Sequence, residues 1–246
     1  MKLIINGAGG RMGQTLLSLI SVSEKYTLAA SCSMEFDTNE AENVYKNINE
    51  FTGEADCIID FSNHLATKDV TEYAVRRNIP LVVATTGQTA EELDMIKKAS
   101  ESIPLFYSQN MSLGVAVLSC LAKITAKAFP DADIEIIEKH HNQKLDVPSG
   151  TAILLADAIK SVKDDCEYNI GRHEYGKRKK NEIGIHAIRM GGEVGTHEII
   201  FAMGSQVLTL KHEAENRSLF AEGALSAADF LTKQEAGFYN MDNILD

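Results

Sequence analysis

Two patterns in the sequence predict an α/β protein with two domains. In the first half, short apolar runs typical of strands alternate with helical patterns, which indicates a doubly wound parallel sheet. In the second half, strand patterns follow one another and predict an α+β domain with a mostly antiparallel mixed sheet. The change of pattern falls near residue 111, and 246 residues suffice for one large domain or two small ones.

The composition narrows the classes of function. Apolar residues make up 44% of the chain, enough for a buried core, and no apolar run is long enough to cross a bilayer. The formal net charge of −11 argues against nucleic-acid binding, and the basic run 177–180 is interpreted as a solvated loop. Four cysteines without a C-x-x-C pair, and no signal peptide, predict a cytoplasmic protein without a membrane partner.

A glycine-rich turn at 7–13 follows the first predicted strand, residues 3–5. Apolar residues then recur at helical spacing as far as Ile20. Three glycines of this turn stand three residues apart, whereas the common dinucleotide pattern would place its third glycine at Met12. Such a turn lets a pyrophosphate reach a helix N-terminus, so a Rossmann-type dinucleotide site is predicted. A tight turn without a ligand is the alternative.

Two more loops of the first half, 84–87 and 108–111, also follow predicted strands. Ligands of parallel α/β sheets bind beyond the carboxyl ends of the strands, so these loops should line one crevice with the glycine turn. Thr85, Thr86 and Asn110 can offer hydrogen bonds to a nicotinamide carboxamide. Turn chemistry alone is the alternative for each loop.

The residue that usually binds the adenosine ribose does not stand at its expected place. The strand at 27–31 is followed by Cys32-Ser33-Met34-Glu35, so the expected acid is missing or displaced to Glu35. A preference between NADH and NADPH therefore does not follow from these residues.

The second half opens with a predicted helix at 112–128, which Ser112 can cap. An alternating strand at 134–138 leads to two histidines, and Ser149 is the expected N-cap of the next helix. Residues 164–181 are polar and indicate a loop. The remaining elements are antiparallel strands at 183–189, 196–203 and 207–212 and a helix at 218–231.

Residues 138–152 concentrate the groups that suit acid–base chemistry. His140 and His141 are adjacent and point to opposite faces of a strand, so they do not suit one metal and no metal is expected. One histidine can donate a proton near neutral pH, and Lys144 adds a positive charge. Backbone N–H groups at Gly150 and Thr151 can hold a carboxylate. Together with a nicotinamide site, this set indicates hydride delivery followed by protonation; a purely structural histidine pair is the alternative.

Over its whole length the chain resembles the 4-hydroxy-tetrahydrodipicolinate reductase (dihydrodipicolinate reductase) family. The most specific match is the run from Glu138 to Ala152, with its His-His, Lys and Asp-x-Pro-Ser-Gly-Thr-Ala. The other matching stretches are residues 7–13, Asp60-Phe61-Ser62, residues 84–87 and 110–114, Ile183-Gly184 with Arg189, Gly195 with His197-Glu198, and Phe220-Ala221 with Gly223-Ala224.

The resemblance implies reduction of 4-hydroxy-tetrahydrodipicolinate, a cyclic dicarboxylate, to tetrahydrodipicolinate with loss of water, using NADH or NADPH, in lysine and diaminopimelate biosynthesis. It implies His140 as proton donor or acceptor and Lys144 as a second proton donor. The implied substrate-binding residues are His141, Ser149, Gly150 and Thr151. The implied cofactor-binding residues are Gly7, Ala8, Gly9, Gly10, Arg11, Met12, Ala84, Thr85, Thr86, Ser108, Gln109, Asn110 and Met111.

The resemblance also implies the domain organisation. The family is commonly tetrameric through its sheet-bearing domain, and its last helix usually packs on the nucleotide domain. We therefore expect a dinucleotide-binding domain at 1–111 and 222–246, a substrate-binding and oligomerisation domain at 112–221, and a homotetramer.

The chain departs from the usual family pattern at three places. Asn142-Gln143 replaces more basic residues, Ala84 replaces a glycine, and Cys32-Ser33 stands where many members have an acid and an arginine. The last departure leaves the preference between NADH and NADPH open, and use of both cofactors is the hypothesis. Two other functions are considered: another Rossmann-type dehydrogenase acting on a small carboxylate, and a non-catalytic nucleotide-binding regulator.

Overall fold

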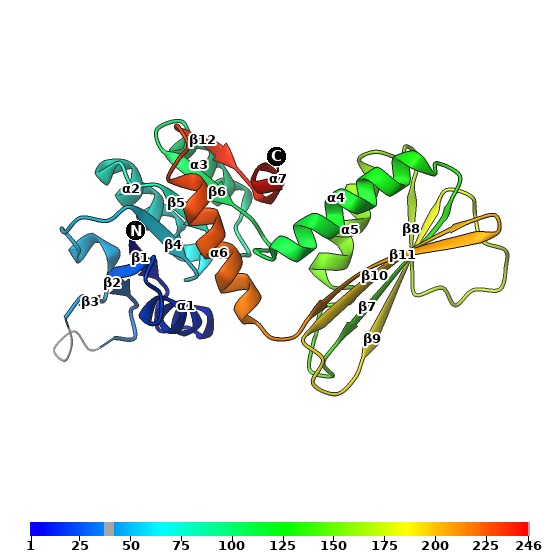
Figure 1. Cartoon of the computed structure of the whole chain (residues 1–246), viewed down its shortest axis with the longest axis horizontal. Helices are drawn as coiled ribbons and strands as arrows, with labels where there is room; N and C mark the ends of the chain where they lie inside the picture. Colours follow the sequence, from blue (N-terminus) through cyan, green and yellow to red (C-terminus); the bar gives the residue numbers. More distant parts are fainter. Residues whose placement is uncertain (37–41, 246) are drawn as a thin grey trace. The chain divides into compact units, whose positions relative to one another are not determined.

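The structure is a computed structural model that describes residues 1–36 and 42–245, and the chain divides into two compact units (Figure 1). Unit 1 contains Met1–Ser112 and Ser218–Asp246, and unit 2 contains Leu113–Arg217. The expected second boundary, between residues 221 and 222, falls inside the helix α6 (Ser218–Leu231), which contacts strands of unit 1.

Unit 1 is built on a parallel sheet with the strand order β12-β6-β5-β4-β1-β2-β3. The chain runs outward from β1 in one direction and then returns to β4 on its other side. This reversal is the switch point at which α/β sheets bind ligands. The strands are β1 (Lys2–Asn6), β2 (Thr27–Cys32), β3 (Val44–Tyr45), β4 (Cys57–Asp60), β5 (Leu81–Val83), β6 (Pro104–Tyr107) and β12 (Gly237–Tyr239).

Helices cover both faces of this sheet, as the alternating pattern predicts. Helix α1 (Arg11–Ser21) packs with α6 over one face, where Phe106 meets Phe230. Helices α2 (Thr67–Arg77) and α3 (Ala90–Ser100) pack on the other face. Because both faces are covered, the central strands are continuous apolar runs without polar alternation. Two 3₁₀ turns, η1 (Ile48–Glu50) and η2 (His64–Ala66), and a short last helix, α7 (Met241–Leu245), complete the unit.

Unit 2 is built on a mixed sheet with the strand order β11-β10-β7-β9-β8. Two of its pairings are antiparallel, β10 with β11 and with β7, whereas β7–β9 and β8–β9 are parallel. Helices α4 (Leu113–Ala128) and α5 (Gly150–Lys160) pack over one face through a core that includes Ile136, Leu155 and Phe201. The strands are β7 (Asp133–His140), β8 (Glu167–Ile170), β9 (Glu182–Arg189), β10 (Gly195–Met203) and β11 (Gln206–Ala214).

Two sequence expectations for unit 2 need correction. The region expected to be only a loop, 164–181, contains the strand β8, whose side chains are half-buried or exposed and carry no apolar alternation. Strand β9 is not a neighbour of β10, because β7 lies between them. The prediction of antiparallel strands therefore holds for β10 and β11 and is wrong for β9, which pairs in parallel with β7 and β8.

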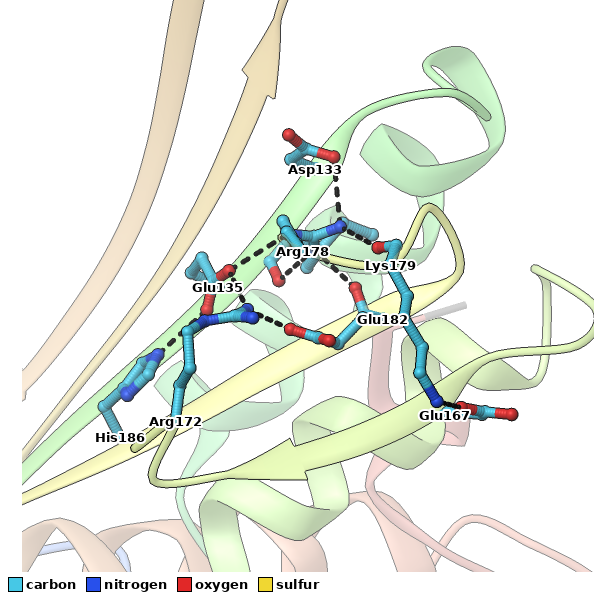
Figure 2. Close-up of polar contacts among 9 residues, drawn as sticks. Asp133, Glu135, Glu167, Arg172, Arg178, Lys179, Glu182 and His186 are labelled. Atoms are coloured by element: carbon cyan, nitrogen blue, oxygen red, sulfur yellow. Dashed lines mark hydrogen bonds and ion pairs between the residues drawn. The ribbon is translucent and has the colours of Figure 1, made fainter. Parts of the chain in front are cut away.

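The basic run 177–180 is only partly solvated. Lys180 is exposed and pairs with Asp131, but the Arg178 side chain is 18% exposed and lies across the ends of β7 and β9. Figure 2 shows Arg178 and Arg172 converging on Glu135, whose carboxylate also contacts His186 Nε2 at 2.9 Å. These contacts attach the β8–β9 loop to the sheet face that α4 and α5 leave uncovered.

Candidate active site

The glycine turn of unit 1 is a tight turn between β1 and α1. Gly7 has a φ of +81°, and a Cβ there would lie 2.6 Å from the carbonyl group of Phe61. A Cβ at Gly13 would lie 2.3 Å from the Gly7 carbonyl oxygen. Gly10 is the N-cap of α1 and offers no side-chain cap, so the backbone N–H groups of the first turn face no competing side-chain acceptor from the cap residue. These features fit a dinucleotide phosphate.

Asp60 joins the three strand ends beside this turn. Its carboxylate is 1% exposed and accepts hydrogen bonds from Asn6 Nδ2 at 2.8 Å, Ser62 Oγ at 2.5 Å and Thr85 Oγ1 at 2.7 Å. Burial raises the pKa of Asp60, although the three side-chain donors act in the opposite direction. The ends of β1, β4 and β5 are therefore held together by one enclosed carboxyl group.

The other predicted cofactor residues lie at the same edge of the sheet, since they follow β5 and β6. Ala84 and Met111 are buried, whereas Thr86 and Gln109 are exposed. The Ser108 hydroxyl donates to the carbonyl of Asn110 at 2.7 Å and so shapes the second loop. The parallel sheet thus brings the predicted set together, as the strand pattern indicated.

A cavity of about 490 Å³ lies beside the glycine turn, within unit 1. Gly7 and Gly10 line one side, and Ser33 and Glu35, which follow β2, line another. A Cβ at Gly9 would lie 2.6 Å from Ser33 Oγ and 3.4 Å from Glu35 Oε2. The displaced acid therefore does lie at the glycine turn, as the sequence allowed.

In unit 2, strand β7 presents Glu138 and His140 on the same face, because they are two residues apart. Glu138 is fully buried, and its Oε2 lies 2.6 Å from His140 Nδ1. Arg189, the partner of His140 in the β7–β9 register, donates to both carboxylate oxygens at 2.7 and 2.8 Å. The Ser149 amide donates to Oε1 at 3.0 Å, which brings the start of α5 into the same network.

Charge and burial act oppositely on this network. Burial alone would raise the pKa of Glu138, but hydrogen bonds from His140, Arg189 and the Ser149 amide outweigh it and lower this pKa to about 2. His197 on β10 lies beside His140, with ring centroids 5.2 Å apart. Burial and then the neighbouring His140 lower the pKa of His197 to about 3. Glu138 is therefore ionised and His197 neutral at physiological pH.

The remaining predicted residues follow β7 or begin α5. Ser149 is the N-cap of α5, as expected: its hydroxyl accepts from the Ala152 amide at 3.2 Å. The same hydroxyl lies 3.0 Å from His197 Nε2, and Ser149 is 1% exposed. In the loop between β7 and α5, Lys144 Nζ lies 2.8 Å from Asp146 Oδ1. Hydrogen bonding to Lys144 lowers the pKa of Asp146, and the Gly150 amide acts in the same direction. Basic groups and a helix N-terminus are thus assembled within one unit.

Comparison with known proteins gives this arrangement a family. Models of the N-terminus and the C-terminus of dihydrodipicolinate reductase match residues 1–111 and 114–245. The chain belongs to the dihydrodipicolinate reductase family. A protein of Caldanaerobacter subterraneus subsp. tengcongensis named 4-hydroxy-tetrahydrodipicolinate reductase is 44% identical over 100% of this chain and 98% of its own length. A protein of the same name from Clostridium novyi is 42% identical over 99% and 98%.

Solved structures agree with membership of the reductase family. A dihydrodipicolinate reductase from Paenisporosarcina sp. TG-14, solved with bound dipicolinate, has a TM-score of 0.85, 26% identity and 99% coverage of both chains. The diaminopimelate dehydrogenase of C. glutamicum has a TM-score of 0.61 at 10% identity, over 100% of this chain and 95% of its own, and shares the fold alone. The predictions of fold class, family and NAD(P)H-dependent oxidoreductase are confirmed. No helix among the described residues has the length and apolar character to span a membrane.

Several residues of the polar cluster in each unit were absent from the predicted set. Glu138 could have been found, because period two on a strand places it on the face of His140. Arg189 and His197 come from strands whose order in the sheet has no local signal. Asp60 reads in the sequence as the last residue of a buried strand, and only the tertiary structure gives it three donors.

Proposed function

We propose that this chain reduces 4-hydroxy-tetrahydrodipicolinate to tetrahydrodipicolinate, with loss of water, in lysine and diaminopimelate biosynthesis. The observation that supports this most is the Glu138–His140–Arg189 network beside Lys144 and the N-terminus of α5, in a chain matched by the reductase family over its length. A solved relative that binds dipicolinate, a planar dicarboxylate, supports a dicarboxylate substrate here.

Unit 1 would hold the nicotinamide cofactor. Gly7, Gly10 and the first turn of α1 would bind its pyrophosphate, because Gly10 is exposed and begins α1 without a side-chain cap over the first N–H groups. Thr85, Thr86 and the 108–111 loop would bind the nicotinamide end at the neighbouring strand ends. When bound, the nicotinamide supplies the hydride. The cofactor would therefore contact three loops, residues 7–12, 84–86 and 108–111.

Unit 2 would bind the dicarboxylate and move the proton. Lys144, His141 and the backbone N–H groups of Gly150 and Thr151 would hold the carboxylates, with Ser149 shaping the helix start. His140 would carry the proton that completes the reduction, and Lys144 would serve as a second donor. The contact with Asp146 holds the Lys144 ammonium group in the loop that precedes α5. A carboxylate of the substrate would replace Asp146 as its partner.

Both NADH and NADPH are proposed as cofactors. Glu35 lies by the glycine turn and can accept hydrogen bonds from the ribose of NADH. Arg11 and Lys46 are the basic residues near the same turn and cavity, and either can offset the charge of a 2′-phosphate. The proposal fails if steady-state efficiencies with the two cofactors differ by more than about a hundredfold, roughly 2.7 kcal/mol.

The uncovered face of the unit 2 sheet is proposed to form the homotetramer. It carries exposed Val207 and Ile188 between ion pairs such as Lys139–Glu198, a mixture suited to a self-complementary interface. Sedimentation of the whole chain would test this assembly. A cytoplasmic location stays a prediction.

A coupled assay tests the reaction. Dihydrodipicolinate synthase would generate the substrate in place, and absorbance would report oxidation of NADH or NADPH. We expect oxidation that requires both the synthase product and this chain, and a fall in kcat of about 10²-fold or more in His140→Ala with a smaller change in KM. No oxidation by folded wild-type protein that still binds cofactor would refute the reductase assignment.

A further inference from the structure

The carboxylate of Glu138 is the most completely enclosed charge in the described part of unit 2. It accepts from His140 Nδ1 at 2.6 Å, from two nitrogens of Arg189 and from the Ser149 amide at 3.0 Å. Of these donors, only the imidazole has a second ring nitrogen, and that nitrogen can donate or accept. Glu138 therefore connects Arg189 and the Ser149 amide to one imidazole ring.

This contact determines which nitrogen of His140 carries its permanent proton. An ionised carboxylate can only accept, so the nitrogen that faces Glu138 must be N–H in both the neutral and the charged ring. The other nitrogen, Nε2, is then the one that gains and loses the proton. Arg189 forms an ion pair with Glu138. The carboxylate can therefore orient the His140 ring without being an unpaired buried anion.

Nε2 of His140 lies against a residue without a side chain. A Cβ built on Gly195 of β10 would stand 3.0 Å from Nε2 and 3.4 Å from Cδ2. Gly195 does not have a positive φ, so its backbone conformation does not require glycine. The absence of a side chain at this position leaves room at the nitrogen that Glu138 does not occupy.

We propose that Glu138 is the positioning residue of the reductase, that its bond to Nδ1 makes Nε2 the proton-donating atom of His140, and that Gly195 keeps the space at Nε2 free for the substrate. This inference rests on the proposed function and adds to it the reactive atom and two residues to which no role was assigned. Arg189 holds Glu138 in place from the position on β9 that pairs with His140.

The first test replaces Glu138 by Gln. The amide NH₂ must then face either Arg189 and the Ser149 amide, which cannot accept, or His140 Nδ1, which would have to give up its proton. We expect kcat to fall about 10²-fold while KM changes less than about threefold. The matched control is Glu167→Gln, which removes a carboxylate of the same sheet whose contact is with the exposed Lys179; its kcat should match the wild type.

A spectroscopic measurement reports the same feature without turnover. Long-range ¹H–¹⁵N correlation spectra of the full chain, assigned with His140→Gln, distinguish the two neutral tautomers of His140. We expect Nδ1–H with unprotonated Nε2 in the wild type and loss of that preference in Glu138→Gln. A wild-type ring with its proton on Nε2 would overturn the proposal, and so would wild-type kcat in Glu138→Gln.

Gly195→Ala keeps the test decisive if Glu138→Gln does not fold. The added methyl group meets Nε2 but leaves the Glu138 contact intact, so the Nδ1–H tautomer should persist while kcat falls about tenfold or more. Unchanged kcat in Gly195→Ala would remove the role of Gly195. If the wild type oxidises no cofactor, the proposed function fails, yet the tautomer still decides whether Glu138 positions the ring.

Discussion

Asp60 and Glu138 are both enclosed carboxyl groups at the carboxyl end of a buried strand, one in each unit, but their partners differ in charge. Asp60 is held by the Asn6 side-chain amide, two hydroxyl groups and the Ser62 backbone N–H at 3.3 Å, all neutral. Glu138 is held by Arg189, by His140 and by one backbone amide. Burial raises the pKa of Asp60, whereas the cationic partners bring that of Glu138 down to about 2. Similar burial thus gives opposite shifts, and the partners decide the direction.

The two groups consequently link stability to pH with opposite signs. The folded pKa of Glu138 is depressed, so its contribution is present above its ordinary value of 4.5 and is lost as pH falls towards about 2. The folded pKa of Asp60 is raised above 3.8, so the protonated form favours folding and stability falls as pH rises through that folded pKa. Neutral donors therefore suit Asp60, which connects the loops at the ends of three strands. Charged donors suit Glu138, which fixes the orientation of His140.

Of the substitutions considered, removal of the Arg189 guanidinium should change the free energy of unfolding most. Arg189→Met leaves Glu138 enclosed with only His140 and the Ser149 amide as donors. Breaking a buried ion pair by deleting one partner costs about 3 kcal/mol or more. We expect that loss in the free energy of unfolding of unit 2, measured by hydrogen exchange of peptides covering β7 and β9. A loss below about 1 kcal/mol would mean that Glu138 does not need its charged partner.

Acid should lower the free energy of unfolding of unit 2 through His197. His197 binds a proton in the unfolded chain below its ordinary pKa of 6.5 but in the folded chain only near 3, so stability falls as pH drops. Between pH 7 and pH 5 this difference amounts to about 2 kcal/mol. Burial also lowers the pKa of His212, which adds to the same trend.

His197→Asn provides the comparison for that pH dependence. We expect the variant to lose about 2 kcal/mol less than the wild type between pH 7 and pH 5, from exchange of β7 peptides corrected for intrinsic rates. Equal losses in the two proteins would show that His197 is not neutral in the folded state.

The two units differ in how much of their structure the sequence could predict. Unit 1 was predictable because continuous apolar strands, glycine turns and helices are local patterns that a parallel sheet assembles in one way. His140 and Lys144 were singled out because they stand within one short run, and their roles stay a prediction. Thr85 was placed on the correct edge, since all three loops follow strands.

Sequence could not predict contacts that depend on strand order. Arg189 reaches Glu138 only because β9 lies beside β7, and the sequence pattern suggested β10 as the neighbour of β9. Strand β8 was missed because Glu167–Ile170 has too few buried side chains to show a period. A carboxylate's partners, and hence its pKa, are therefore the least local property of the site.

A neutral replacement should be tolerated better at Asp60 than at Glu138. In Asp60→Asn the Thr85 hydroxyl can turn and accept from the new NH₂ group, and the cost of burying a charge disappears. We expect the free energy of unfolding of unit 1 to change by less than about 1 kcal/mol, with KM for the cofactor raised at most about threefold. Asp60→Leu removes the carboxylate that accepts from Asn6 and Thr85 and leaves each with only its longer contact, at 3.2 Å to Ser62 Oγ and 3.3 Å to the backbone carbonyl of residue 60. This loss should cost about 2 kcal/mol. A larger loss in the Asn variant than in the Leu variant would contradict this account.

The smallest effect should come from a carboxylate that is paired but exposed. Glu167 contacts Lys179 at 3.0 Å, and both side chains are more than half exposed, at 59% and 69%. Water screens such a pair, and exposed pairs contribute about 0.2 to 1 kcal/mol. Glu167→Gln should therefore shift the free energy of unfolding of unit 2 by less than about 0.5 kcal/mol and lose even that difference in 1 M salt. A loss comparable to that of Arg189→Met would mean that pairing alone, and not enclosure, sets the strength of these contacts, and the contrast between Asp60 and Glu138 would then need another cause.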